Sequence, residues 1–143
     1  MSAETEPAIG WPGEVGVSQV RIARPTDKLE AVVRFYRDGL GLPVIDSFKG
    51  HAGYEGVMLG LPGRRYHLEF TQHGEGSPCP APSRDNLLVL YVPVLAHHAA
   101  LCARIEALGV KPVAPENPYW IDRAVTYEDP DGRRVVLCRN RGI

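Results

Sequence analysis

The chain has 143 residues, of which 44% are hydrophobic and 23% are charged, as is usual for one globular domain with a sizeable core. A formal net charge of −1 and the absence of any basic run argue against a nucleic-acid or anionic-membrane partner. No apolar stretch of membrane-spanning length and no signal-peptide pattern is present, so a cytoplasmic protein is expected. The three cysteines, Cys79, Cys102 and Cys138, have no CxxC spacing and are expected to be reduced thiols.

The first half of the chain predicts a strand, a helix and three further strands. Residues 1–15 are polar and rich in Pro and Gly, which indicates a flexible N-terminal arm. A strand is predicted at 18–25 and a helix at 26–42, where Asp27 and Glu30 resemble a capping box. Three short strands follow, at residues 42–48, 54–62 and 66–72.

A segment rich in Pro, Gly and Ser, residues 73–85, has the composition of a linker. After it the same order of elements is predicted again, with a strand at 86–93 and a helix at 95–109. The remaining strands are predicted at 110–114, 124–129 and 133–140, the last two joined by a tight Asp-Pro-Asp-Gly turn.

The two halves can be aligned without a gap. Gln19 falls on Leu87, Pro25 falls on Pro93, and the helix-ending Gly41 falls on Gly109, all at one spacing. A shared spacing across strand, helix and helix end indicates an internal repeat. The sequence therefore predicts an α+β fold of two tandem βαβββ modules, at 16–72 and 86–140, within one domain spanning 16–143. The alternative is a generic α+β domain whose halves are similar by coincidence.

Four segments carry a resemblance to a known family: RFYRDGLGLPVI, YHLEFTQH, ENPYW and YEDPDGRRVVL. They are similar to those of the vicinal-oxygen-chelate superfamily, which includes glyoxalase I, extradiol dioxygenases and bleomycin-resistance proteins. The resemblance covers residues 17–140. It implies that each module forms half of an open β-cup, that the protein is a homodimer, and that the pocket can be shared between subunits.

Enzymes of this superfamily hold a divalent metal at four equivalent positions. The resemblance places these positions at Gln19, Glu69, Leu87 and Val136. A catalytic metal needs about three ligands from imidazole, carboxylate or thiolate groups. Leu87 and Val136 offer none, so neither a metal nor another cofactor is expected, and the resemblance points to the metal-lacking, antibiotic-binding branch.

Strand alternation predicts which side chains face the cup. One half is polar and the other is mainly apolar, and aromatic residues form the rim. The predicted ligand-binding residues are Gln19, Arg21, His67 and Glu69 in the polar half, Leu87, Val89, Tyr91, Arg134 and Val136 in the other half, and Phe48, Tyr54, Tyr119 and Trp120 at the rim.

Several of these residues also have purely structural interpretations. Glu69 could form an ion pair with Arg21 or Arg134, and Trp120 could fill part of the core. The remaining histidines are not expected in the site: His51 and His73 are predicted to lie in loops, and His97 and His98 to be solvated or lightly packed on a helix.

Apolar walls with a few directed polar groups suit a small organic ligand. The first hypothesis is a protein that sequesters an aromatic antibiotic unchanged, with a flat, largely neutral compound such as a quinone enediyne favoured over cationic bleomycin. The alternative is a lyase, isomerase or dioxygenase with an atypical or absent metal site, in which Glu69 acts as a general base assisted by His67 or Tyr91. A ligand-sensing regulator with the same cup is a third interpretation.

Overall fold

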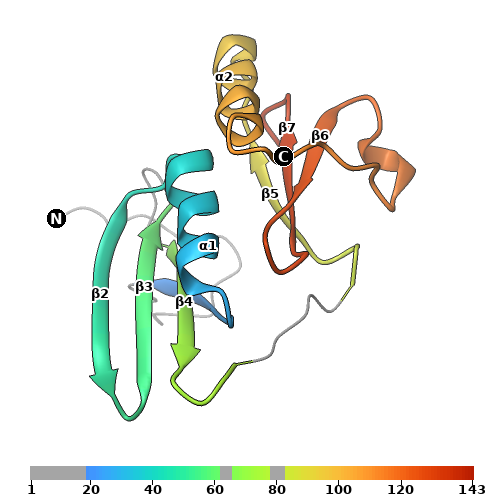
Figure 1. Cartoon of the computed structure of the whole chain (residues 1–143). Helices are drawn as coiled ribbons and strands as arrows, with labels where there is room; N and C mark the ends of the chain where they lie inside the picture. Colours follow the sequence, from blue (N-terminus) through green and yellow to red (C-terminus); the bar gives the residue numbers. More distant parts are fainter. Residues whose placement is uncertain (1–18, 62–65, 78–82) are drawn as a thin grey trace, which may run out of the picture.

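The first half of the chain folds into a four-stranded sheet (Figure 1). The computed structural model describes residues 19–61, 66–77 and 83–143, so the predicted arm at 1–15 and Cys79 lie outside the described residues. Neighbouring strands follow in the order β1 (Val20–Pro25), β4 (Tyr66–His73), β3 (Tyr54–Gly60) and β2 (Val44–His51). β1 is parallel to β4, and the other pairs are antiparallel.

The second half repeats this plan with a smaller sheet. β5 (Leu87–Tyr91) runs parallel to β7 (Arg134–Cys138), and β7 pairs antiparallel with β6 (Ala124–Glu128). In each half, therefore, the first strand lies parallel beside the last strand, with a helix between them in the sequence (Figure 1). The predicted α+β fold of two related modules is confirmed.

The strand predicted at 110–114 is the exception, because only Val113 pairs there, in a single bridge to Thr126. Pro112 and Pro115 lie close on either side. Proline has no backbone N–H to donate to a ladder, so pairing cannot extend past one residue.

The tight turn between β6 and β7 forms as the sequence predicts. Asp129 accepts hydrogen bonds from the backbone N–H groups of Asp131 (2.8 Å) and Arg133 (2.9 Å) through its side chain. Gly132 has a φ of 85°, a left-handed conformation that glycine adopts without steric cost. This hairpin fixes the register of β7, the strand that carries Val136.

The first helix begins differently from the prediction. α1 (Leu29–Val33) has no capping box: the Asp27 carboxylate accepts the backbone N–H of Ser77, and the side-chain oxygen of Gln72 accepts the Leu29 N–H at 2.9 Å. Tertiary partners thus replace the expected local cap. The predicted pairing of Asp27 with Glu30 is wrong.

α1 continues as a wider π-helical stretch, η2 (Arg34–Gly39). At its end the Leu40 N–H donates to the Phe35 carbonyl five residues back, at 3.1 Å. A side chain at Gly39 would come within 3.2 Å of Leu108, so glycine lets the end of the second helix approach closely. The two helices therefore meet at this point.

The second helix, α2 (Leu95–Glu106), is followed by Gly109 at a φ of 89°, as the sequence predicts. One of its histidines differs from expectation. His98 is only 4% exposed, and its Nε2 atom lies 2.8 Å from the carbonyl oxygen of Leu137 in β7. The prediction that His98 is solvated or lightly packed is wrong, because α2 buries this side chain against the backbone of the sheet.

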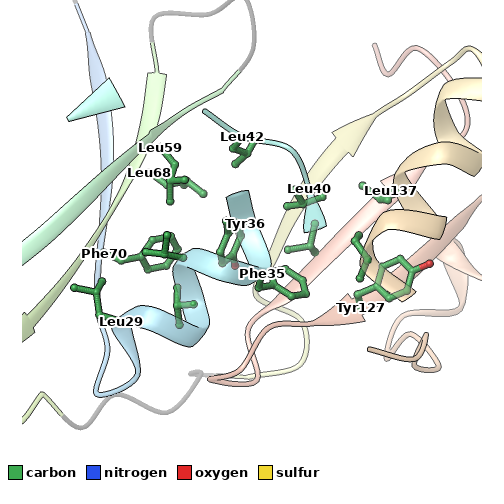
Figure 2. Close-up of a cluster of buried hydrophobic side chains, with 14 residues drawn as sticks. Leu29, Phe35, Tyr36, Leu40, Leu42, Leu59, Leu68, Phe70, Tyr127 and Leu137 are labelled. Carbon is green, nitrogen blue, oxygen red and sulfur yellow. The ribbon is translucent and has the colours of Figure 1, made fainter. Parts of the chain in front are cut away.

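One hydrophobic core joins both modules (Figure 2). It takes one face of each sheet and the apolar faces of the helices between them. Its buried members are Leu29, Val32, Val33, Phe35, Tyr36, Leu40, Leu42, Leu59, Leu68, Phe70, Ile105, Tyr127, Val135 and Leu137. In the described part of the chain, no helix is long and apolar enough to cross a membrane.

Candidate functional site

The polar half of the predicted site forms on the first sheet. Parallel pairing of β1 with β4 places Arg21 beside His67 and Ala23 beside Glu69. The Arg21 Nε donates to His67 Nε2 at 2.9 Å, and an Arg21 Nη lies 3.5 Å from a Glu69 carboxylate oxygen. The expected ion pair of Glu69 is therefore made with Arg21. His67 is 2% exposed and Glu69 is 8% exposed, whereas about half of the Arg21 side chain is open to solvent.

This contact determines where His67 carries its proton. A guanidinium can only donate, so Nε2 of His67 must be the acceptor and Nδ1 must carry the hydrogen. Nδ1 is buried, and among the described residues it has no hydrogen-bond partner. An unpaired buried donor costs about 1–3 kcal/mol. The polar set thus holds one buried N–H group that has no acceptor among the described residues.

Aromatic side chains gather at one end of the same face of the first sheet. The Phe48 ring lies over Gly56, where a Cβ atom would come within 2.5 Å of it. Tyr54 makes an edge contact with His73, with ring centroids 4.6 Å apart. His51 lies 6.3 Å from Phe48 between ring centroids. Two predicted rim residues, Phe48 and Tyr54, therefore lie on strands of this sheet.

Sequence reasoning missed His51 and His73. Each is the last residue of a strand, β2 and β4 respectively, and the prediction that both lie in loops is wrong. The contact of His51 with Phe48 lies within β2, whereas the contact of His73 with Tyr54 crosses from β4 to β3. Strand register, which sequence alone does not give, brings the rings of His73 and Tyr54 together.

The apolar half forms on the second sheet. Val136 and Cys138 are fully buried in a cluster of their own, with Ala124, against which Leu87, Val89 and Trp120 pack. Trp120 belongs to a short 3-10 helix, η3 (Pro118–Trp120), whose N-terminus is capped by the side chain of Asn117. A narrow hollow over this cluster is too tight to admit a water molecule.

A second unpaired polar atom lines this hollow. Thr126 is 3% exposed, and its hydroxyl has no hydrogen-bond partner among the described residues. Arg134 also lines the hollow, but its guanidinium is already engaged by the Glu128 carboxylate (2.9 Å) and the Ala114 carbonyl (2.9 Å). Thr126 was not predicted as a site residue. Arg134 was predicted as one, but its side chain is paired within the second module.

The remaining predicted residues lie at the margins. Tyr119 is 54% exposed, with the Arg123 guanidinium 3.9 Å from its ring centroid, and it meets Trp120 edge-on. Tyr91 is 45% exposed and lies against Gly142 near the C-terminus. Gln19 is exposed just before β1.

The two half-sites are not joined within one chain. Leu68 and Phe70 on the first sheet, and Val135 and Leu137 on the second, point into the shared core. Alternating residues point the opposite way. The polar and apolar sets therefore lie on outer faces, with the core between them, and among the described residues no hydrogen bond, ion pair or ring contact links one set to the other. Tyr91 lies on the second sheet, which separates it from the polar set that holds Glu69.

By the family resemblance, four positions of this chain correspond to metal ligands, and the residues found there do not suit a metal. Val136 is fully buried among apolar side chains, Leu87 packs beside it, and Glu69 is paired with Arg21. Across residues 19–61, 66–77 and 83–143, no group of three His, Cys, Asp or Glu side chains could hold an ion. The donor set therefore does not fit a catalytic divalent metal.

Two family models match the chain along its two modules. The YycE-like N-terminal domain matches residues 20–71, and the YycE-like C-terminal domain matches residues 85–139. The uncharacterized protein YycE of Bacillus subtilis (strain 168) is 50% identical over 126 residues, which cover 88% of this chain and 91% of that protein. The crystal structure of a Bacillus subtilis YycE protein of unknown function has a TM-score of 0.84 at 50% identity, covering 88% of this chain and 92% of that one.

More distant solved structures share the fold. The fosfomycin resistance protein FosX from Mesorhizobium loti has a TM-score of 0.65 at 15% identity, covering 88% of this chain and 92% of that one. TnmS3, an antibiotic binding protein from Streptomyces sp. CB03234, has a TM-score of 0.63 at 23% identity, covering 89% and 99%. These likenesses establish the glyoxalase-type fold that the resemblance implied.

Proposed function

We propose that this chain, which belongs to the YycE-like family, binds a small, flat antibiotic in the cytoplasm and withholds it unchanged, giving drug resistance. The observation that carries this proposal is the apolar cluster at the positions resembling metal sites, where Val136 is fully buried with Leu87 against it. This cluster offers no ligand to an ion, and its half-buried members Leu87 and Val89 favour burial of apolar ligand area. Antibiotic binding by TnmS3, which shares the fold, is consistent with this use.

A second copy of the chain completes the pocket in this proposal. The two half-sites lie on outer faces of one chain, so a homodimer can set the polar face of one subunit against the apolar face of its partner. Closed two-fold assemblies are the commonest protein oligomers. The hollow of one chain admits no water-sized molecule, whereas a typical ligand pocket has roughly 300–1,000 Å³, so a second surface is needed to bury a drug-sized compound.

The polar groups indicate what the ligand carries. His67 Nδ1 offers a buried N–H that suits a carbonyl or quinone oxygen, and the Phe48 ring and Tyr54 suit a flat conjugated system. Arg21 and Glu69 neutralise one another, and the net charge is only −1. A neutral aromatic ligand such as a quinone enediyne therefore fits better than a cationic one such as bleomycin.

The test is a capture experiment with named compounds. Purified protein is mixed with mitomycin, bleomycin and a quinone enediyne, separated from free compound, and denatured, and the released compound is weighed by mass spectrometry. Recovery of an intact quinone compound at about one per pocket supports sequestration. Recovery of a compound of altered mass supports the alternative, a lyase or dioxygenase-like enzyme with Glu69 as base. Capture of none of the compounds contradicts the proposal.

Two variants sharpen the result. His67→Phe keeps a ring but removes the buried donor, and it is expected to weaken capture about 5- to 30-fold, the loss of one hydrogen bond of about 1–2 kcal/mol. His97→Phe on the exposed face of α2 is the matched control and is expected to leave capture unchanged. Equal affinities of wild type and His67→Phe would remove His67 from the site.

A further inference from the structure

A second cavity lies away from both half-sites, in an open groove beside α2. Its volume is about 620 Å³, large enough for a small organic molecule. α2 contributes residues at helical spacing, which form one continuous face. The lining residues are Leu95, His98, Ala99, Cys102, Ala103 and Glu106 of α2, together with Pro112, Val125 and Arg139.

A cysteine and a histidine meet in this groove. Cys102 and His98 are one turn apart on α2, and Cys102 Sγ lies 3.8 Å from His98 Nδ1. His98 Nε2 faces the Leu137 carbonyl oxygen at 2.8 Å. A carbonyl oxygen can only accept, so Nε2 carries the hydrogen and Nδ1 presents a lone pair to the thiol. The imidazole is thus held in the tautomer of a base for Cys102.

The thiol has a further neighbour in Tyr127. The Tyr127 hydroxyl donates to the Glu106 carboxylate at 2.6 Å. Burial first, and then hydrogen bonding to Cys102 and Glu106, raises the pKa of Tyr127, so this phenol stays protonated at neutral pH. The groove holds one anion, Glu106, and one cation, Arg139, so no strong net charge opposes a thiolate–imidazolium pair.

We propose that Cys102 is a nucleophilic thiol, activated by His98, that captures small α,β-unsaturated carbonyl compounds in this groove. His98 Nδ1 takes the thiol proton, and Sγ forms a bond to the β-carbon as the C=C electron pair moves toward the carbonyl. The resulting enolate takes the proton back from His98 at its α-carbon. The product is a thioether, and the addition needs no oxidant, reductant or leaving group.

The groove suits this class of electrophile. Its walls are mainly aliphatic, which favours an uncharged carbon skeleton, and Arg139 supplies a cation suited to the enolate oxygen. Cys138 is fully buried on the second sheet and serves as an internal comparison for a thiol without access. This site is separate from the proposed antibiotic pocket and does not depend on it.

The test measures adduct formation on the full-length protein with 2-cyclohexen-1-one. Tryptic mapping after timed reaction gives a separate rate for each cysteine. Cys102 is expected to react at pH 7 about tenfold faster than free glutathione, because His98 takes the thiol proton as Sγ forms the new bond.

Two variants distinguish activation of Cys102 by His98 from simple solvent exposure of the Cys102 thiol. His98→Phe is expected to lower the Cys102 rate about tenfold or more and to change the dependence of that rate on pH. His97→Phe, on the exposed side of the helix, is expected to change neither. A Cys102 rate in the wild-type protein no higher than that of glutathione would overturn the proposal. This comparison requires no variant, so it stands even if His98→Phe does not fold.

Discussion

The Tyr36 hydroxyl donates a 2.8 Å hydrogen bond to Asp129, a residue 93 positions later in the chain. Tyr36 belongs to η2 of the first module, and Asp129 begins the hairpin turn of the second. Both side chains are almost fully buried, at 0% and 4% exposure. This bond therefore connects the two modules through the core, at the turn that fixes the register of the strand carrying Val136.

Removing this bond is expected to destabilise the whole domain. Tyr36→Phe leaves one acceptor of the buried Asp129 carboxylate without its donor, which costs about 1–3 kcal/mol of unfolding free energy. Urea unfolding followed by circular dichroism measures the change. Tyr66→Phe, at a residue 42% exposed, is the control and is expected to have no effect. A Tyr36→Phe protein as stable as the wild type would show that the bond contributes nothing net.

Asp129 is also expected to make stability depend on pH. Burial raises the pKa of Asp129 above its usual value of 3.8, against the opposing effect of hydrogen bonds from Tyr36 and from the backbone. The folded state therefore binds its proton more tightly than the unfolded state. This contribution to stability grows as pH falls from above the folded pKa toward 3.8, and it is lost as pH rises.

Asp129→Asn removes the titrating group and isolates this contribution. The free energy of unfolding is measured for the wild type and the variant between pH 4 and pH 7. The wild-type value minus the variant value is expected to increase as pH falls. A difference that is flat over this range contradicts the raised pKa. A difference of the opposite slope would show that the hydrogen bonds dominate over burial.

Gly56 is expected to control the position of the Phe48 ring. Gly56→Ala would place a Cβ within 2.5 Å of Phe48 and 3.2 Å of Thr71, so the ring must move off the sheet. The cost is expected to be about 1–3 kcal/mol of stability, with weaker capture of aromatic compounds. Gly74→Ala, where the nearest atom is 3.7 Å away, is the matched control. If Gly56→Ala captures quinone compounds as well as wild type, then Phe48 does not contact the ligand.

Restoring donors at the two apolar positions is expected to create a metal site. Leu87→His together with Val136→Glu adds an imidazole and a carboxylate to the hollow on the second sheet. If a partner subunit brings Glu69 opposite, three ligands meet, and equilibrium dialysis with Mn²⁺ is expected to give about one ion per pocket. Adding Glu69→Gln is then expected to abolish binding. Mn²⁺ binding that persists without Glu69 would contradict the shared pocket, and the double variant is also expected to lose affinity for quinone compounds.

The sequence alone was sufficient to predict the two modules and the faces of their strands. A strand has a period of two, so Leu68 and Phe70 had to share one face and His67 and Glu69 the other, whatever the strand packed against. The turn at 129–132 was equally local, because its proline and glycine favour one backbone geometry. Leu87 and Val136 have no metal-binding atoms, so the sequence alone was enough to predict that these two positions cannot hold a metal.

Tertiary structure decided how these faces are arranged and which polar groups are left unpaired. The apolar residues of α1 and η2 pack against both sheets, and this placed the two half-sites on opposite outer faces. The tautomers of His67 and His98 depend on Arg21 and on the Leu137 carbonyl, which lie 46 and 39 residues away in the chain. Such contacts arise from register and packing between distant segments, which local sequence patterns do not encode.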